Sequence, residues 1–488
     1  MATALIQLHN VRCHLNRLQQ FQELSWTLQT GENWVFYGGN GCGKTALAKL
    51  VSGLLPISSG SRTLNETLDP RRDIQWVSSD AQKALEDHDH RFDDSETRDD
   101  AHDEGTRVGD IIFHGRTPSN DDKTWLDKLG MTPHLNRGIR YVSSGQLRKT
   151  LLLKAYADQP RVLIIDDPMA GLDIESQANV RELIQTIAES DTQLILLLRR
   201  RSDIVAGISH IAELADCKIV SAGPRPKDWE HQRLSDTHAA RTFDLAAPQR
   251  ETITAGTNLI SMDKVTARYH DKVVFSDLSF ALNAQQHCSV SGPNGCGKST
   301  LIQIMNAENA MAYGQNVRLF GKKRGGGESI WEVKANFGEV SNRIHEQYGR
   351  GWTIQQVVIS GLYDSIGLYK RPSNTDKARA KQCLSNFDIN AKSDALYTKL
   401  SYGQQRLVLL ARAIIKIPPI LLLDEALTGL DDEHQEQFLH ILDQVVRNTD
   451  TTVINITHRQ EEQPRFIKHH WRFIANNTGS HDLVLSPA

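Results

Sequence analysis

A glycine-rich loop of the pattern G-x-x-x-x-G-K-[ST] occurs twice in this chain of 488 residues and constrains the fold more than any other feature. The second copy lies between a strand-like run at residues 287–291 and a helix-like run at residues 300–305. In such loops the glycines let backbone N–H groups surround phosphate oxygens, the lysine reaches the outer phosphates, and the hydroxyl reaches Mg²⁺. The sequence therefore predicts an α/β fold that binds a nucleotide.

The residues of the two loops are the predicted nucleotide contacts. They are Gly38, Gly39, Asn40, Gly41, Cys42, Gly43, Lys44 and Thr45 in the first copy, and Gly292, Pro293, Asn294, Gly295, Cys296, Gly297, Lys298, Ser299 and Thr300 in the second. A glycine turn that binds nothing is the alternative, but it would not explain the acidic residues that follow farther along the chain.

Those acids stand at the end of an apolar run. Residues 420–423 read ILLL and are followed at once by Asp424 and Glu425. A buried parallel strand that ends on two carboxylates places them at the carboxyl edge of the sheet, where open α/β sheets bind their ligands. This pattern predicts a metal and phosphate site.

The motif order is the same in both halves, so the chain is a repeat. SSGQLRKTLLLKAY from Ser143 corresponds to SYGQQRLVLLARAI from Ser401, and Gly171-Leu172-Asp173 corresponds to Gly429-Leu430-Asp431. We expect a first domain at residues 5–223, a polar linker at residues 224–258 and a second domain at residues 259–488.

Residues 80–110 are strongly acidic and poor in apolar side chains. Because such a run buries too little surface to order itself, we expect a solvated insertion in the first domain. A weak metal site formed by His88, His90 and His102 is an alternative, although the spacing is not that of a tetrahedral site.

Composition excludes several classes of protein. A net charge of −3 does not favour a global nucleic-acid surface, and six cysteines without C-x-x-C spacing indicate a reducing compartment. No apolar run approaches the ~20 residues that span a bilayer, and the amino terminus does not resemble a signal peptide. We therefore expect a cytoplasmic protein; if it serves a membrane process, another chain must supply the permease.

The ordered set of phosphate loop, S-x-G-Q element, strand with paired acids and G-L-D closely resembles the ATP-binding cassette (ABC) ATPases. The resemblance covers almost the whole chain twice and implies two P-loop NTPase domains in tandem, each a mixed sheet with a helical subdomain. It implies ATP and Mg²⁺ as cofactors, and a pairing of the two halves within one chain. Each ATP would lie between one phosphate loop and the opposite signature element, Ser143 with Gly145 or Ser401 with Gly403.

The resemblance also assigns roles to single residues. In the second copy Asp424 is the metal-side acid, Glu425 the general base and His458 the histidine that senses the γ-phosphate. In the first copy Asp166 is the metal-side acid, but the shorter Asp167 holds the base position and Arg199-Arg200-Arg201 replaces the histidine. We expect the first copy to retain ATP and the second to hydrolyse it. The alternative is that Asp167 still works and an arginine serves at the γ-phosphate.

Two further positions differ from the family pattern or between the copies. Tyr269 stands where the family stacks an aromatic ring on adenine, whereas the first copy has Leu15. Asn342 and Ser79 stand where the family usually has a glutamine that contacts metal and water, and Gln82 lies near Ser79. Thr45, Ser299, Asp166, Asp424 and Asn342 are the predicted metal ligands.

The resemblance leaves the function open among three classes. Residues 319–342 and 360–369 resemble a twin-cassette branch of the family associated with molybdate uptake, which favours an ATPase subunit that powers or regulates transport. A soluble ABC protein acting on ribosomes or nucleic acid is the alternative, although such proteins carry a longer, basic linker. A nucleotide-gated switch with little turnover is the third.

Overall fold

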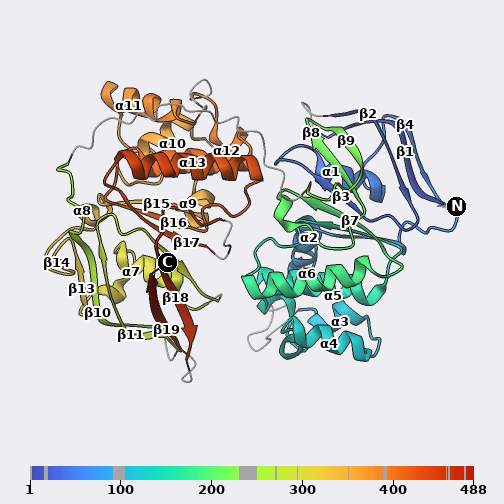
Figure 1. Cartoon of the computed structure of the whole chain (residues 1–488), viewed down its shortest axis with the longest axis horizontal. Coiled ribbons are helices and arrows are strands. Elements are labelled where there is room, and N and C mark those ends of the chain that lie inside the picture. Colours follow the sequence, from blue (N-terminus) through green and yellow to red (C-terminus); the bar gives the residue numbers. More distant parts are fainter. Residues whose placement is uncertain are drawn as a thin grey trace. The chain divides into compact units, whose positions relative to one another are not determined.

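The computed structural model describes residues 3–15, 20–91, 105–229, 250–269, 272–293, 295–349, 351–387, 389, 393–457, 459, 462–476 and 480–487. The chain divides into two compact units, Met1–Leu234 and Ser235–Ala488, and Figure 1 shows each with its own strands and helices. Among the described residues, no helix is long and apolar enough to cross a membrane.

The first unit is built on a six-stranded sheet in the order β5-β6-β7-β3-β8-β9, parallel except for the last pair. A three-stranded antiparallel sheet, β2-β1-β4, shares a core with one face of it. The strands are β1 (Ala4–His14), β2 (Gln20–Gln29), β3 (Trp34–Tyr37), β4 (Ser59–Leu64), β5 (Ile74–Val77), β6 (Val162–Asp166), β7 (Gln193–Leu198), β8 (His210–Ala215) and β9 (Lys218–Pro224).

The second unit repeats this arrangement. Its ten-stranded sheet runs β14-β13-β10-β11-β19-β18-β12-β17-β16-β15, and the last six strands correspond to the six-stranded sheet of the first unit. The strands are β10 (Asn258–Tyr269), β11 (Lys272–Asn283), β12 (Cys288–Ser291), β13 (Asn316–Leu319), β14 (Lys322–Lys323), β15 (Phe337–Ser341), β16 (Ile420–Asp424), β17 (Thr452–Ile456), β18 (His469–Ala475) and β19 (His481–Pro487).

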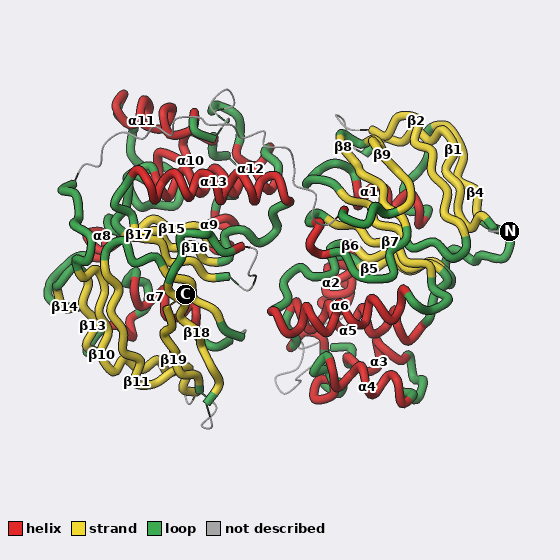
Figure 2. The backbone as a smooth tube through the Cα atoms, in the orientation of Figure 1, coloured by secondary structure: helices red, strands yellow, loops and turns green. Residues whose placement is uncertain are grey.

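The helices of the first unit are α1 (Lys44–Ser52), α2 (Ser79–Arg91), α3 (Val108–Phe113), α4 (Asn120–Lys128), α5 (Ser144–Asp158) and α6 (Ile174–Ala188). In the second unit they are α7 (Lys298–Met305), α8 (Ile330–Lys334), α9 (Asn342–Gln347), α10 (Ile354–Ser360), α11 (Asn374–Ser385), α12 (Tyr402–Ile414) and α13 (Asp432–Asn448). Helices α3–α6 of the first unit and α10–α13 of the second gather at one end of their unit, whereas α1, α7 and α8 lie beside the strands (Figure 2).

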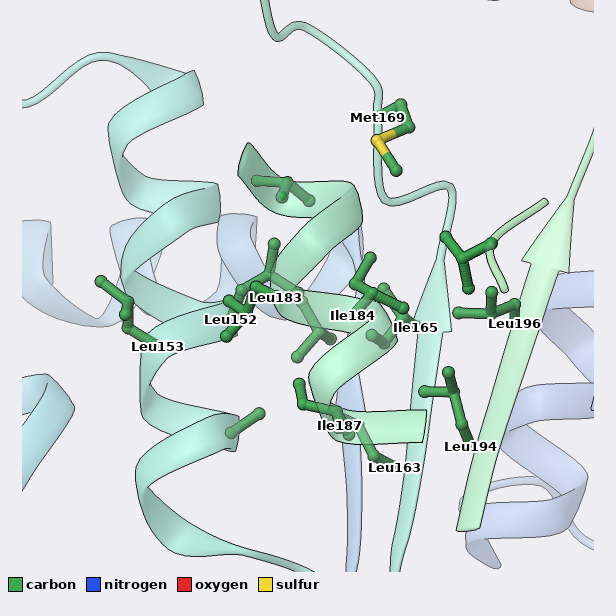
Figure 3. Close-up of a cluster of buried hydrophobic side chains, with 14 of the residues drawn as sticks. Leu152, Leu153, Leu163, Ile165, Met169, Leu183, Ile184, Ile187, Leu194 and Leu196 are labelled. Atoms are coloured by element: carbon green, nitrogen blue, oxygen red, sulfur yellow. The ribbon is translucent and has the colours of Figure 1, made fainter. Parts of the chain in front are cut away.

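Each parallel sheet separates two hydrophobic cores, because successive side chains of a strand point to opposite faces. In β6, Val162 and Ile164 join the core that contains α1, whereas Leu163 and Ile165 join the core with α5 and α6. Figure 3 shows the latter pair beside Leu194 and other side chains of that core. A strand apolar on both faces is therefore fully covered, and its polar carboxyl end is left at the edge of the sheet.

The acidic stretch at residues 80–110 is not wholly the solvated insertion that its composition predicts. Helix α2 occupies its first part, and Asp89 on this helix is buried, with 5% exposure. Arg140 Nε lies 2.8 Å from Asp89 Oδ2, and the Thr106 N–H and hydroxyl donate to Oδ1 at 2.9 and 2.8 Å. Burial disfavours ionisation, but the bonds from Thr106 and Arg140 outweigh it and lower the pKa of Asp89.

Composition is misleading here because a partner 51 residues away orders the helix. Residues 92–104 lie outside the described part, and so does His102; His88 lies on α2. Among the described residues there is no group of three or more side chains able to hold a metal ion.

Both ends of the predicted linker pack on the units that they join. Trp229 is buried on the first unit, where its ring contacts Tyr37 edge-on at 5.1 Å and its Nε1 donates to Glu213 at 3.3 Å. Arg250 forms an ion pair with Asp450 of the second unit at 2.6 Å. The middle of the linker, residues 230–249, lies outside the described residues, so its role as a linker stays a prediction.

Candidate active sites

The first phosphate loop joins the buried strand β3 to helix α1. Lys44 Nζ donates to the carbonyl oxygens of Gly38 at 2.6 Å and Gly39 at 2.8 Å, so the lysine lies over its own loop. Gly43, at φ 106°, caps α1 without a side-chain hydrogen bond, and a Cβ there would lie 3.1 Å from Phe21. The loop therefore presents a helix N-terminus and a lysine to the same place, which suits a phosphate group.

The second loop has the same geometry. Lys298 Nζ donates to the carbonyl oxygens of Gly292 and Pro293, both at 2.9 Å. Gly297 also has φ 106° and caps α7 without a side-chain bond, and a Cβ there would lie 2.5 Å from Val274. Burial raises the pKa of the Cys296 thiol. Asn294 lies outside the described residues.

The predicted magnesium ligands of the first unit are brought together. Thr45 Oγ1 donates to Asp166 Oδ2 at 2.7 Å, although 121 residues separate them. A hydroxyl and a carboxylate side by side at a phosphate loop are the oxygen ligands that Mg²⁺ takes beside nucleotide phosphates. Ser299 and Asp424 occupy the matching places in the second unit, in the first turn of α7 and at the last residue of β16.

The residue after each of these acids has the same unusual backbone. Asp167 and Glu425 both have φ 50°, in the left-handed region that residues with a Cβ rarely adopt. In each case the N–H donates at 3.0 Å to a carbonyl of the neighbouring strand, Leu197 in the first unit and Ile456 in the second. The two units thus hold the predicted general base on one common backbone, with a carboxylate one methylene shorter in the first.

The largest difference between the two sites lies on the neighbouring strand. Asp166 pairs with Leu197 and Asp424 with Ile456, so the register places Arg199 at the position of His458. Arg199 Nη2 forms an ion pair with Asp167 Oδ2, and the two side chains are only 21% and 17% exposed. The run of three arginines was the sequence signal, but the ion pair itself was missed. His458 lies outside the described residues.

Tyr269 is the last residue of β10 and is 42% exposed. Its hydroxyl accepts a hydrogen bond from Asn309 Nδ2 at 2.9 Å. Ala267 pairs with Phe275 as Cys13 pairs with Phe21, so Leu15 of the first unit occupies the position equivalent to Tyr269 of the second. The second unit has an accessible ring for stacking, and the first has an aliphatic side chain; contact with adenine stays a prediction.

The signature elements are helix starts. Ser143 Oγ accepts from the Gln146 N–H and Ser401 Oγ from the Gln404 N–H, both at 3.2 Å, and both starts are complete capping boxes. A Cβ on Gly403 would lie 2.4 Å from His434, and one on Gly145 would lie 3.4 Å from the Gly171 carbonyl oxygen. The contact with His434 explains the small residue at 403, whereas the distance at Gly145 is an ordinary van der Waals contact. A role against ATP stays a prediction.

Sequence reasoning missed two buried arginines that contact the coupling-loop positions. Arg148 Nη2 donates to Ser79 Oγ at 2.9 Å, and Arg406 Nη2 donates to Asn342 Oδ1. Burial lowers the pKa of Arg148, and the negative charge of Asp166 opposes that shift. Because the Asn342 amide oxygen already accepts a hydrogen bond, its predicted role as a metal ligand would use the remaining lone pair.

Comparison with known proteins agrees with this geometry. The family profile "ABC transporter" matches residues 21–170 and 275–428. The chain is 31% identical over 468 residues to the ABC transporter ATP-binding protein ModF of Escherichia coli, covering 94% of each chain. It is 28% identical over 212 residues to the zinc uptake system ATP-binding protein ZurA of Listeria innocua, covering 43% of this chain and 80% of that protein.

Among solved structures, the chain resembles the archaeal ribosome recycling factor aABCE1, solved in complex with the ribosomal stalk protein aP1. The TM-score is 0.65 at 14% sequence identity, covering 98% of this chain and 90% of that one. RNase-L Inhibitor matches with a TM-score of 0.61 at 15% identity over the same fractions. These likenesses show the fold, whereas the family profile and the relatives show more: the chain belongs to the ABC transporter family of ATP-binding proteins and is an ATPase with two cassettes in tandem.

Proposed function

We propose that the second unit hydrolyses most of the ATP, that the first unit mainly retains it, and that the chain is the ATPase subunit of a transport system. The observation that carries the asymmetry is the ion pair between Arg199 and Asp167. A guanidinium beside a carboxylate favours its charged form, whereas a general base must accept a proton from water. Asp167 is also one methylene shorter than Glu425, and proton transfer depends steeply on distance.

The remaining groups support binding at both sites. Lys44 and Lys298 would hold the outer phosphates, while Thr45 with Asp166, and Ser299 with Asp424, would hold Mg²⁺. When bound, that ion neutralises charge developing on the phosphates. The roles of Glu425 as general base and His458 as γ-phosphate sensor follow the family pattern, as does the pairing of each ATP with the opposite signature element.

Steady-state ATPase measurements on the full chain test this proposal. Glu425→Gln should lower kcat on the order of 100-fold or more, since positioned general bases contribute about 10²–10⁴-fold. Asp167→Asn is the matched control and should change kcat by less than about threefold. Filter binding should show that both variants still retain ATP. An active Glu425→Gln together with an inactive Asp167→Asn would show that the assignment is reversed.

Transport is supported by the resemblance of residues 319–342 and 360–369 to the branch associated with molybdate uptake, and by the relatives ModF and ZurA. We infer that a permease supplied by another chain, at the cytoplasmic face of the plasma membrane, is the partner and that molybdate is the cargo. Affinity purification from separated membrane and ribosome fractions tests this. Recovery with an integral membrane protein supports the proposal, and recovery with ribosomes alone contradicts it.

Action on the ribosome is the second candidate, and the likeness to the archaeal ribosome recycling factor favours it. That likeness concerns the fold alone, at 14% identity, so it gives this candidate less support than the relatives give transport. A nucleotide-gated switch is the third. If the wild-type chain hydrolyses ATP more slowly than it exchanges bound nucleotide, with the two rates measured side by side, the switch is favoured over both.

A further inference from the structure

The signature helix of the second unit begins with an aromatic ring that fills a space inside that unit. The Tyr402 hydroxyl donates to the Thr428 carbonyl at 3.1 Å and accepts from Arg406 Nη2 at 2.7 Å. The Arg406 guanidinium lies 5.2 Å from the ring centroid. A Cβ on Gly429 would lie 2.5 Å from the ring. The ring is therefore held by a cation, a carbonyl and a glycine, and the His345 imidazole meets it edge-on at 5.1 Å.

The first unit keeps the arginine and the glycine that contact this ring, but it has Gln82 at the position of His345 and lacks the ring itself. The repeat places Ser144 at the position of Tyr402, Arg148 at Arg406, and Ala170-Gly171 at Thr428-Gly429. Where Gly429 touches the tyrosine, a Cβ on Gly171 would meet nothing within 4 Å. The serine hydroxymethyl group is too small to replace a phenol ring.

A cavity of ≈ 500 Å³ lies at this place in the first unit. We call it the α5 cavity; it is lined by residues that include Ser79, Gln82, Ser144, Arg148, Ala170 and Gly171. Its volume falls within the ~300–1,000 Å³ of small-molecule sites. Arg148, only 6% exposed, is fixed by its bond to Ser79 Oγ at 2.9 Å. Because the guanidinium is already held in place, stacking a ring on its face costs no further side-chain entropy.

We propose that the α5 cavity binds a phenol ring, presented either by a free small phenol or by a tyrosine side chain of a peptide. The ring would lie on the Arg148 guanidinium and against Gly171, and its hydroxyl would donate to the Ala170 carbonyl. Lys83, Glu86 and Asp87 also line the cavity. Their charged side chains would suit polar substituents on the ring. The inference holds whichever unit hydrolyses ATP.

Fluorine NMR with 4-fluorophenol as the probe tests this on the full chain. The wild type should bind one equivalent saturably, and Ser144→Tyr, which places the ring in the cavity covalently, should raise the dissociation constant by at least about tenfold. Fluorobenzene, which lacks the hydroxyl, should bind at least about threefold more weakly than 4-fluorophenol. Equal binding to wild type and to folded Ser144→Tyr would overturn the proposal.

The second unit offers the matched control. Tyr402→Ser empties the equivalent space and should raise the stoichiometry from one to two; an unchanged stoichiometry counts against the site even if Ser144→Tyr fails to fold. A Gly-Tyr-Gly tripeptide distinguishes the two sources of the ring. Displacement of 4-fluorophenol by the tripeptide identifies a peptide ligand, and its failure to displace the probe identifies a free phenol.

Discussion

The two units have the same backbone conformation where the strands with the paired acids end, but they carry different side chains there. Asp167 and Glu425 share a φ of 50° and the same 3.0 Å bond to the neighbouring strand. Arg199, however, pairs with the carboxylate of the first unit, at the place that His458 holds in the second sequence. Duplication preserved what the fold requires, the strained backbone and the phosphate loop, while the groups that move protons were free to diverge.

A second contrast concerns how each unit holds the turn before its signature helix. In the first unit Arg140, in the turn Ile139–Tyr141, pairs with Asp89 on the 13-residue helix α2. In the second, the corresponding turn is fixed by Tyr397, which is 1% exposed, and helix α9 has only six residues. Each turn buries its first side chain, Ile139 in one unit and Tyr397 in the other, and the first unit adds a buried ion pair.

Asp89→Asn should break that contrast with the largest effect. Removing one partner of a buried pair leaves the other charge uncompensated and costs about 3–5 kcal/mol. We expect this loss in the first unit alone, measured as faster hydrogen exchange in α2 and Ile139–Tyr141 with the second unit unchanged. Asp87→Asn, an exposed neighbour, is the control and should stay within about 0.5 kcal/mol. Equal protection in Asp89→Asn and the wild type would show that the pair does not order α2.

His287→Asn tests a pH dependence at the β12–β17 pair of strands that the matching β3–β7 pair of the first unit should lack. His287 Nδ1 accepts the Val453 N–H at 3.2 Å, and burial, with the nearby His469, lowers its pKa to about 4. In the first unit Asn33 makes the matching bond to Leu194 N at 2.8 Å and does not titrate. Neutral His287 is favoured by folding, so its contribution is fully present above about pH 6.5 and is lost as pH falls towards 4.

The loss of stability across that pH window is up to about 3 kcal/mol, since each tenfold change in a protonation equilibrium corresponds to about 1.4 kcal/mol. Hydrogen exchange of β12 and β17, corrected for intrinsic rates, should show this loss of stability in the wild type between pH 6.5 and 4.5. His287→Asn should flatten the profile to that of β3 and β7 in the first unit. A wild-type profile already flat would contradict the assignment.

The sequence predicted what is local and periodic, and missed what depends on distant contacts. The phosphate loops and the strands ending on Asp166 and Asp424 follow from patterns within a few residues, and in the structure Thr45 donates a hydrogen bond to Asp166. The pairing of Arg199 with Asp167 could not be predicted, because it depends on the register of two strands. Asp89 was assigned to solvent for the same reason: its partner is far away in the chain.

Restoring the first site is the sharpest test of the central contrast, with the smallest expected effect. In a Glu425→Gln background, Asp167→Glu with Arg199→His gives the first unit the acid and the histidine of the second. We expect ATPase activity at least about tenfold above Glu425→Gln alone, because the base regains its length and loses its cationic partner.

Asp167→Glu without Arg199→His, in the same background, separates the two causes. If the ion pair disables the site, this variant should stay near the Glu425→Gln level, since the guanidinium still holds the longer carboxylate. Recovery to the level of the triple variant would mean that side-chain length alone was limiting and that Arg199 is neutral. No recovery in either variant would place the defect elsewhere in the first unit, with Leu15 at the adenine position the next residue to change.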